Sequence, residues 1–191
     1  MSSVDHPNAL VRWTLRLEDA AALDGAIGAI EPHVTRLFGS GARGRLLRGE
    51  WLGHALHPLM TDVVVGTWLS AAVLDTLGGK DSADAAQRLV ATGLLAAGPT
   101  AWTGWAEWSH VPVRDKRVGL VHASSNGVAI ALYAASWLAR RRGDQGSGRA
   151  LSLAGFTVSG VGAYLGGHLS EAKKVSSRHP AYADVPPGVL A

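Results

Sequence analysis

Hydrophobic and polar positions divide the chain into a polar first fifty residues, four long apolar segments and a polar tail. The apolar segments are residues 58–77, 89–108, 118–139 and 150–169. A helix needs about 20 mainly apolar residues to cross the hydrocarbon of a bilayer. The third and fourth segments meet that length, whereas the first two carry charged residues inside or near their ends. The pattern predicts an all-α protein, a bundle of four transmembrane helices.

The connections between these segments are short and rich in Gly and Asp, which is typical of turns. Short turns make successive helices antiparallel neighbours. Segment three matches segment one at a constant spacing, and segment four matches segment two at a slightly shorter one. The matched positions include His57 with His122, Thr61 with Asn126, Trp68 with Tyr133, Gly93 with Gly155 and Gly104 with Gly166. This internal repeat predicts two repeated helical hairpins.

The region before the first apolar segment combines helical spacing with breakers. Ile27, Ile30 and Val34 recur at the spacing of one helix face, and Pro32 and a Gly-Ser-Gly run interrupt the pattern. We expect an amphipathic helical arm that lies on the membrane surface, with a soluble helical cap as the equal alternative. The predicted organisation is an N-terminal arm (1–50), a four-helix transmembrane domain (51–170) and a polar C-terminal tail (171–191).

Composition agrees with a membrane protein. Charged residues make up 17% of the chain, against about 25% in an average soluble domain. The chain has 24 Gly and 7 Trp, and both residue types are frequent in membrane helices or at their interfaces. It has no Cys, which excludes disulfides and thiolate metal ligands within this chain. The net charge of +3 comes from Lys and Arg beside the apolar segments, so we expect no nucleic-acid partner.

Histidines gather on one side of the predicted bundle. In an antiparallel arrangement the start of segments one and three and the end of segments two and four face the same side. These ends carry His54, His57, His110, His122 and His168. Two His from facing helices can supply both axial ligands of a haem, and the repeat makes His57 and His122 the symmetry-related pair. His168 and His54 are the next candidate ligands.

Three further residues are candidates for orienting a ligand or moving a proton. Asn126 follows His122 by one helical turn, and Tyr164 shares a face with His168. Asp62 lies inside the first apolar segment, where an ionisable side chain is often functional. The alternative without a function is that the histidines and Asp62 are ordinary polar residues at the membrane interface. The glycines of the fourth segment would then serve only helix packing. A layer of histidines also suits zinc or copper as well as haem b.

The residues around the first two histidines resemble a known signature. Residues 51–62 read Trp-Leu-Gly-His-Ala-Leu-His-Pro-Leu-Met-Thr-Asp. This string is similar to the Gly-His-Pro-Leu-His-Pro signature of a widespread family of uncharacterised bacterial four-helix integral membrane domains. Weaker matches at 104–105, 117–123 and 162–169 extend the resemblance over residues 47–170. Ala55 stands where the family usually has Pro.

The resemblance implies four membrane helices and an association with a redox protein. In actinobacteria, relatives are often fused to a Rieske-type iron–sulphur domain, so a Rieske-type protein is an expected partner. The Cys-His motif of such a domain is absent from this sequence. The resemblance brings no demonstrated activity, and the histidines carry over only as candidate ligands.

The leading functional hypothesis is a membrane protein that binds haem b or a metal for electron transfer or redox sensing. One alternative is a non-enzymatic scaffold or partner subunit. Another is a small proton-coupled transporter that uses Asp62, and a soluble four-helix protein is a further alternative. The sequence contains no recognisable catalytic motif, and it leaves a homo-oligomer open.

Lys and Arg residues give an orientation. Ten lie on the histidine side and six on the other, which favours the histidine side and both termini in the cytoplasm. Together with the family resemblance, this implies a protein of the bacterial cytoplasmic membrane. The run at 140–142 argues for the opposite orientation.

Overall fold

The computed structural model describes residues 7–182, and every regular element in that range is helical. The prediction of an all-α protein is therefore confirmed. The predicted arm and tail extend at 1–6 and 183–191 beyond the described residues. The first three helices are α1 (Ala9–Glu18), α2 (Asp24–Val34) and α3 (Gly41–Leu47). The four long helices are α4 (Leu56–Leu77), α5 (Ala83–Trp108), α6 (Val113–Arg141) and α7 (Gln145–Gly167). Short helical turns lie at Ala21–Leu23, Thr35–Gly39, Glu50–Leu52, Lys80–Ser82, His168–Ala172 and Pro180–Tyr182.

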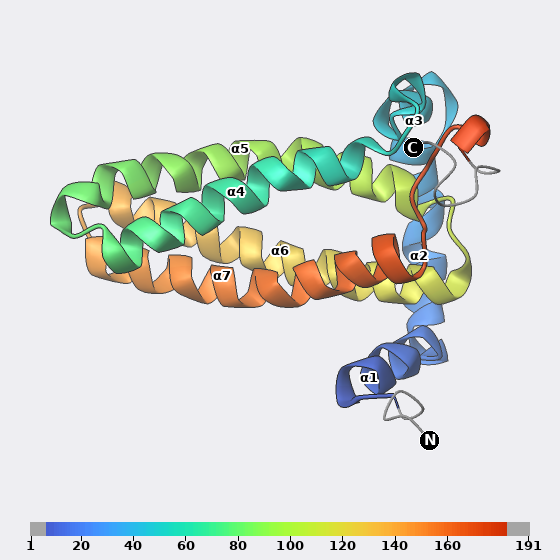
Figure 1. The fold of residues 1–191 in the computed structure, drawn as a ribbon, viewed down its shortest axis with the longest axis horizontal. Helices are drawn as coiled ribbons and strands as arrows, with labels where there is room; N and C mark the ends of the chain where they lie inside the picture. Colours follow the sequence, from blue (N-terminus) through green and yellow to red (C-terminus); the bar gives the residue numbers. More distant parts are fainter. Residues whose placement is uncertain (1–6, 183–191) are drawn as a thin grey trace, which may run out of the picture.

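The four long helices run antiparallel and form one elongated bundle, and α1–α3 all lie at the same end of it (Figure 1). Two tight turns make the opposite end. Gly79 and Gly143 adopt positive φ angles of 70° and 85° in these turns, a conformation that favours glycine. After the second turn, Asp144 Oδ1 accepts a hydrogen bond from Ser147 N at 2.9 Å and caps α7. Helices α4 and α5 pack closely as one hairpin, and α6 and α7 as another.

The middle of the bundle has an apolar core with aromatic rings at its centre. Trp68 of α4 and Tyr133 of α6 stack with ring centroids 3.9 Å apart. Val64, Ala71, Val90 and Ala97 complete this core.

Large apolar side chains also cover the outside of the bundle. Leu95 is 80% exposed, and Leu59, Leu69 and Val128 are exposed as well. Three helices of the described chain are long and apolar enough to cross a membrane, namely Leu56–Leu77, Val113–Arg141 and Gln145–Ala172. Helix α5, the fourth member of the bundle, does not meet the same criterion. An apolar exterior on helices of this length suits a lipid environment.

Helix α2 covers the end of the bundle by burying its apolar face. Ile27 and Val34 pack with Trp108 at the end of α5. Lys116 Nζ donates to Glu31 Oε1 at 2.6 Å. Arg117 Nη2 donates to Asp24 Oδ2 at 2.7 Å. These contacts attach α2 to the beginning of α6, so α2 is a cap made of protein contacts.

Candidate histidine site

His57 and His122 face each other across the bundle axis. His57 lies in the first turn of α4, and His122 lies in the third turn of α6. Their ring centroids are 6.4 Å apart, and the ring planes make an angle of 84°. Both side chains are half-buried. The structure thus brings together the two histidines that the internal repeat paired.

A backbone carbonyl and a threonine hydroxyl of α5 fix the His57 ring. Its Nδ1 lies 2.9 Å from the Thr100 carbonyl oxygen and 3.2 Å from Thr103 Oγ1. The Thr103 hydroxyl itself donates to the Thr100 carbonyl, so both neighbours act as acceptors toward Nδ1. The hydrogen of the neutral ring therefore belongs on Nδ1, and Nε2 keeps a free lone pair.

The His122 ring is held in the same way by α7. Its Nδ1 lies 2.8 Å from the Gly162 carbonyl oxygen, which again assigns the hydrogen to Nδ1. Its Nε2 lies 3.1 Å from Nδ2 of Asn126, which can donate to it. A carbonyl on the second ring nitrogen is the usual arrangement around a metal-ligating histidine, because it fixes the tautomer and orients the ring.

Glycines on the partner helices make room for both rings. A methyl group at Gly104 would lie 2.8 Å from Cε1 of His57. At Gly166 it would lie 3.0 Å from Cε1 of His122. At Gly162 it would collide with Asn126. The Gly162–Gly166 step of α7 is therefore filled by side chains of α6.

A second pair meets at the opposite end of the bundle. Arg140 Nη2 donates to Asp75 Oδ2 at 2.6 Å, and the two side chains are 1% and 4% exposed. Arg140 Nε also donates to Ser136 Oγ at 3.3 Å. This ion pair was missed in the sequence, where Arg140 was counted as a loop charge that sets orientation. The available signal was the spacing between Asp75 and Arg140, which equals the spacing between His57 and His122.

His168 and Tyr164 contact the N-terminal arm. His168 Nε2 lies 2.9 Å from Glu18 Oε1, and Lys173 Nζ donates to Glu18 Oε2 at 2.9 Å. Burial raises the pKa of Glu18, but the hydrogen bonds from Lys173 and His168 outweigh this effect, so the pKa lies below its usual value. The Tyr164 ring packs against Trp13 of α1 at 6.2 Å. These two residues hold α1 to α7.

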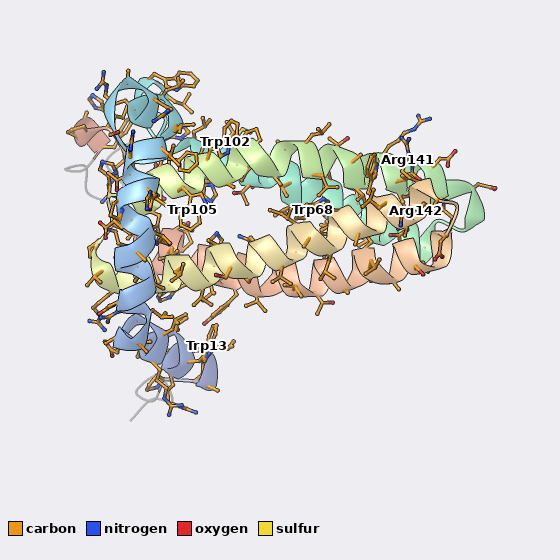
Figure 2. The ribbon with its side chains drawn as sticks, turned by 180° about the vertical axis from the view of Figure 1, so that it is seen from behind. Trp13, Trp68, Trp102, Trp105, Arg141 and Arg142 are labelled. Atoms are coloured by element: carbon orange, nitrogen blue, oxygen red, sulfur yellow. The ribbon has the colours of Figure 1, made fainter. Side chains whose placement is uncertain are left out.

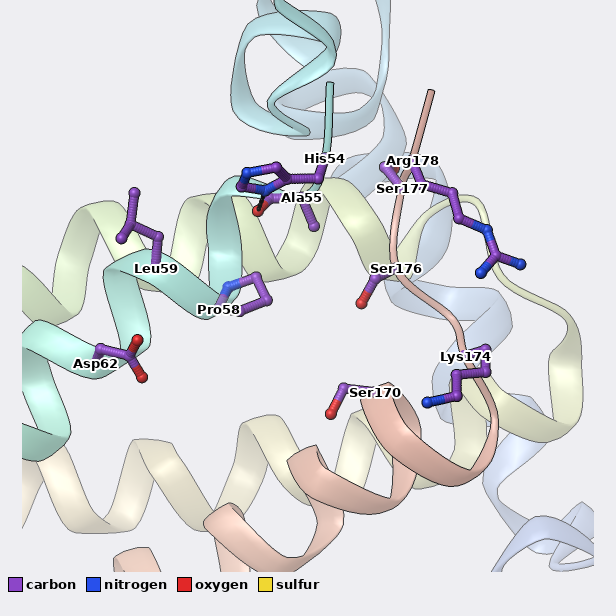
Figure 3. A pocket seen from close by; sticks show the side chains of 10 residues that line it. All are labelled: His54, Ala55, Pro58, Leu59, Asp62, Ser170, Lys174, Ser176, Ser177 and Arg178. Atoms are coloured by element: carbon purple, nitrogen blue, oxygen red, sulfur yellow. Dashed lines mark hydrogen bonds between the residues drawn. The ribbon is translucent and has the colours of Figure 1, made fainter. Parts of the chain in front are cut away.

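His54 and Asp62 line a pocket on the outside of the bundle (Figure 3). The pocket has a volume of about 350 Å³ and lies between the start of α4 and the segment that follows α7. Both side chains are exposed. Ser170 and Lys174 line the opposite wall. Thr100, whose carbonyl contacts His57, is not among the residues that line this pocket.

No group of three or more His, Cys, Asp or Glu side chains is placed to hold a metal ion within residues 7–182. Of the four candidate ligands, only His57 and His122 have facing rings, at 6.4 Å. His168 pairs with Glu18, and the His54 ring lies against the neighbouring carbonyl of Ala55 at 3.1 Å.

The family comparison covers both hairpins. The family described as "Predicted membrane protein (DUF2231)" matches residues 53–179. The chain belongs to DUF2231. No curated protein and no solved structure matches the chain. The matched DUF2231 region contains the histidine pair and the buried ion pair but leaves out α1–α3.

Proposed function

We propose that this DUF2231 protein binds haem b through His57 and His122 and carries electrons at the membrane. The observation that supports this is the facing pair of neutral imidazoles, each with Nδ1 on a backbone carbonyl. With ring centroids 6.4 Å apart, His57 of α4 and His122 of α6 would hold such a group between them.

The number of converging ligands favours haem over a bare ion. A structural zinc site takes four protein ligands and a catalytic site takes three. A haem brings four nitrogens of its own and needs only two from the protein. His57 and His122 would provide these two nitrogen donors through Nε2, since Nδ1 of each ring lies on a backbone carbonyl.

The chain's own residues would position and tune such a group. Haem supplies a one-electron carrier when it is bound. The Thr100 and Gly162 carbonyls orient the rings and raise the basicity of Nε2. Asn126 would turn its amide away from His122 Nε2 when a metal takes that lone pair.

The membrane arrangement we propose is a four-span bundle of two repeated hairpins. Helix α5 has 26 residues. At a rise of about 1.5 Å per residue, a helix of that length can cross a bilayer. Repeat-related residues meet at three levels of the bundle, which favours a pseudo-two-fold axis along its length. The histidine end would face the cytoplasm, and a Rieske-type protein is the expected redox partner.

The reduced-minus-oxidised visible spectrum of the detergent-purified protein tests the proposal. We expect Soret and alpha bands after haem-replete expression. They should disappear in His57→Ala and in His122→Ala. His54→Ala and His168→Ala are the matched controls and should keep the bands.

Two outcomes contradict the proposal. A featureless spectrum of correctly folded protein would leave a membrane scaffold or partner subunit. Bands that survive in both His57→Ala and His122→Ala would move the cofactor to another site.

A further inference from the structure

Helix α1 presents apolar side chains that the rest of the described chain leaves uncovered. Leu10 and Trp13 are 56% and 41% exposed. Together with Leu17 they lie at positions i, i+3 and i+7, which places them on one face of the helix. Helix α2 differs, because its Ile27 and Val34 are buried against the bundle. The two helices of the arm therefore have different surroundings.

The position of α1 relative to the bundle indicates what covers this face. Helix α1 lies beside the end of the bundle, near α7, whereas α2 lies across that end (Figure 1). Trp13 points toward the side on which the long helices extend (Figure 2). Its ring packs on Tyr164 of α7, a residue of a candidate membrane span. The exposed face of α1 thus continues the outer apolar surface of the bundle.

The charges of α1 complement an anionic membrane surface. Arg12 and Arg16 are exposed on the side opposite the buried Thr14 and Glu18. Glu18 is the only acidic residue of α1, and it is paired with Lys173 and His168. The solvent-facing charge of the helix is therefore only positive, as in helices that lie at the boundary of headgroups and acyl chains.

We propose that α1 is an interfacial lipid anchor. Leu10 and Trp13 insert into the acyl boundary of the bilayer that the bundle crosses, and Arg16 contacts anionic phospholipid headgroups. The Glu18 contacts with Lys173 and His168 fix the helix at this depth. The proposal is independent of any cofactor.

Spin-label accessibility measures the depth of each face directly. The chain has no Cys, so single labels at Leu10→Cys, Trp13→Cys and Arg16→Cys need no other substitution. The full-length protein is reconstituted in vesicles of phosphatidylethanolamine and phosphatidylglycerol. We expect the ratio of oxygen to polar-nickel collision rates to be several-fold higher at positions 10 and 13 than at 16. All three side chains are exposed, but Trp13→Cys removes the contact with Tyr164, so the comparison of positions 10 and 16, whose labels keep that contact, decides the test.

Two results would overturn the proposal. Equal, water-like ratios at the three positions would place α1 in solvent. Low collision rates with both reagents at positions 10 and 13 would show a protein partner or a second copy of the chain on this face. Replacement of phosphatidylglycerol by phosphatidylcholine should lower the ratio at position 10, and an unchanged ratio would overturn the role given to Arg16.

Discussion

At each end of the bundle, one polar side chain of α4 faces one of α6, but the two pairs differ in their chemistry. At one end His57 faces His122, and at the other Asp75 faces Arg140. Both pairs join α4 to α6, and the separation along the chain is the same in both. Each histidine has its Nδ1 on a backbone carbonyl and is a candidate ligand through Nε2, whereas the charges of Asp75 and Arg140 neutralise each other.

The comparison indicates that the ion pair has a structural role, whereas the histidine pair is a candidate binding site. A buried ion pair with a direct hydrogen bond has its strongest interactions already made. An imidazole that a backbone carbonyl holds at Nδ1 has its Nε2 for a further bond, and at His122 that atom already lies 3.1 Å from the Asn126 amide. Substitutions at the Asp75 end should therefore lower the free energy of unfolding. Substitutions at the His57 end should lower the amount of haem that the protein binds.

Loss of one partner of the ion pair should have the largest effect. Arg140→Met leaves Asp75 buried and uncompensated, so we expect about 3–5 kcal/mol of destabilisation. Unfolding in detergent, followed by circular dichroism, measures it.

Removal of both charges provides the control for that experiment. Asp75→Leu combined with Arg140→Leu should recover most of the stability, because no unpaired charge remains buried. A single Arg140→Met variant as stable as the parent would show that the pair contributes nothing.

A methyl group at Gly93 should destabilise the middle of the bundle. It would collide with Trp68 and thereby disturb the Trp68–Tyr133 stack. Overpacking of this kind costs about 1–3 kcal/mol. Gly98→Ala on the same helix is the matched control, since a methyl there meets nothing within 4 Å. Equal unfolding midpoints for the two variants would contradict this packing.

At the histidine end, a methyl group should affect ligand binding more than folding. In Gly104→Ala the added carbon lies 2.8 Å from His57 Cε1, and we expect about 1 kcal/mol of destabilisation because the ring can shift. That shift should lower the haem content in the visible spectrum. Gly160→Ala, where a methyl meets nothing within 4 Å, should leave the content unchanged. An unchanged spectrum in Gly104→Ala would argue against His57 as a ligand.

The attachment of α1 should depend weakly on pH. The folded pKa of Glu18 lies below its ordinary value of 4.5, so its contacts stabilise the attached arm above that pH. The stabilisation is lost as the pH falls through the folded pKa. The partners Lys173 and His168 are 28% and 16% exposed, so solvent screens these contacts and we expect an effect of about 1 kcal/mol. Hydrogen exchange of the α1 amides at neutral and acidic pH measures it. Glu18→Gln should remove the pH dependence, and retention of that dependence would assign it to another group.

The four long helices were predictable from the sequence because each contains a long apolar segment. Each of the four apolar segments falls on a long helix, because a long run of apolar side chains favours one element, and α5 continues through Pro99. Helix α6 begins at Val113, before the predicted start at 118, because Arg114, Lys116 and Arg117 continue the helix and pair with the arm. Hydropathy gives the apolar part of a helix and misses its charged turns.

The histidine pair was predictable for a different reason. The repeat spacing, combined with an antiparallel arrangement, brings His57 and His122 to the same end. The sequence pattern did not indicate which of the other candidate residues would lie beside His57 and His122. His168 pairs with Glu18 from the distant arm, and Asp62 lies on an outer pocket.

The sequence by itself determined the helical class, the long helices and the end at which the histidines gather, because each follows from local periodicity or from the order of the segments. Only the tertiary structure decided that Arg140 is buried against Asp75 and that α2 is a cap while α1 keeps an uncovered apolar face. These features depend on contacts between side chains of different helices. Packing and charge complementarity between residues far apart in the chain determine such contacts, and the local sequence pattern does not contain them.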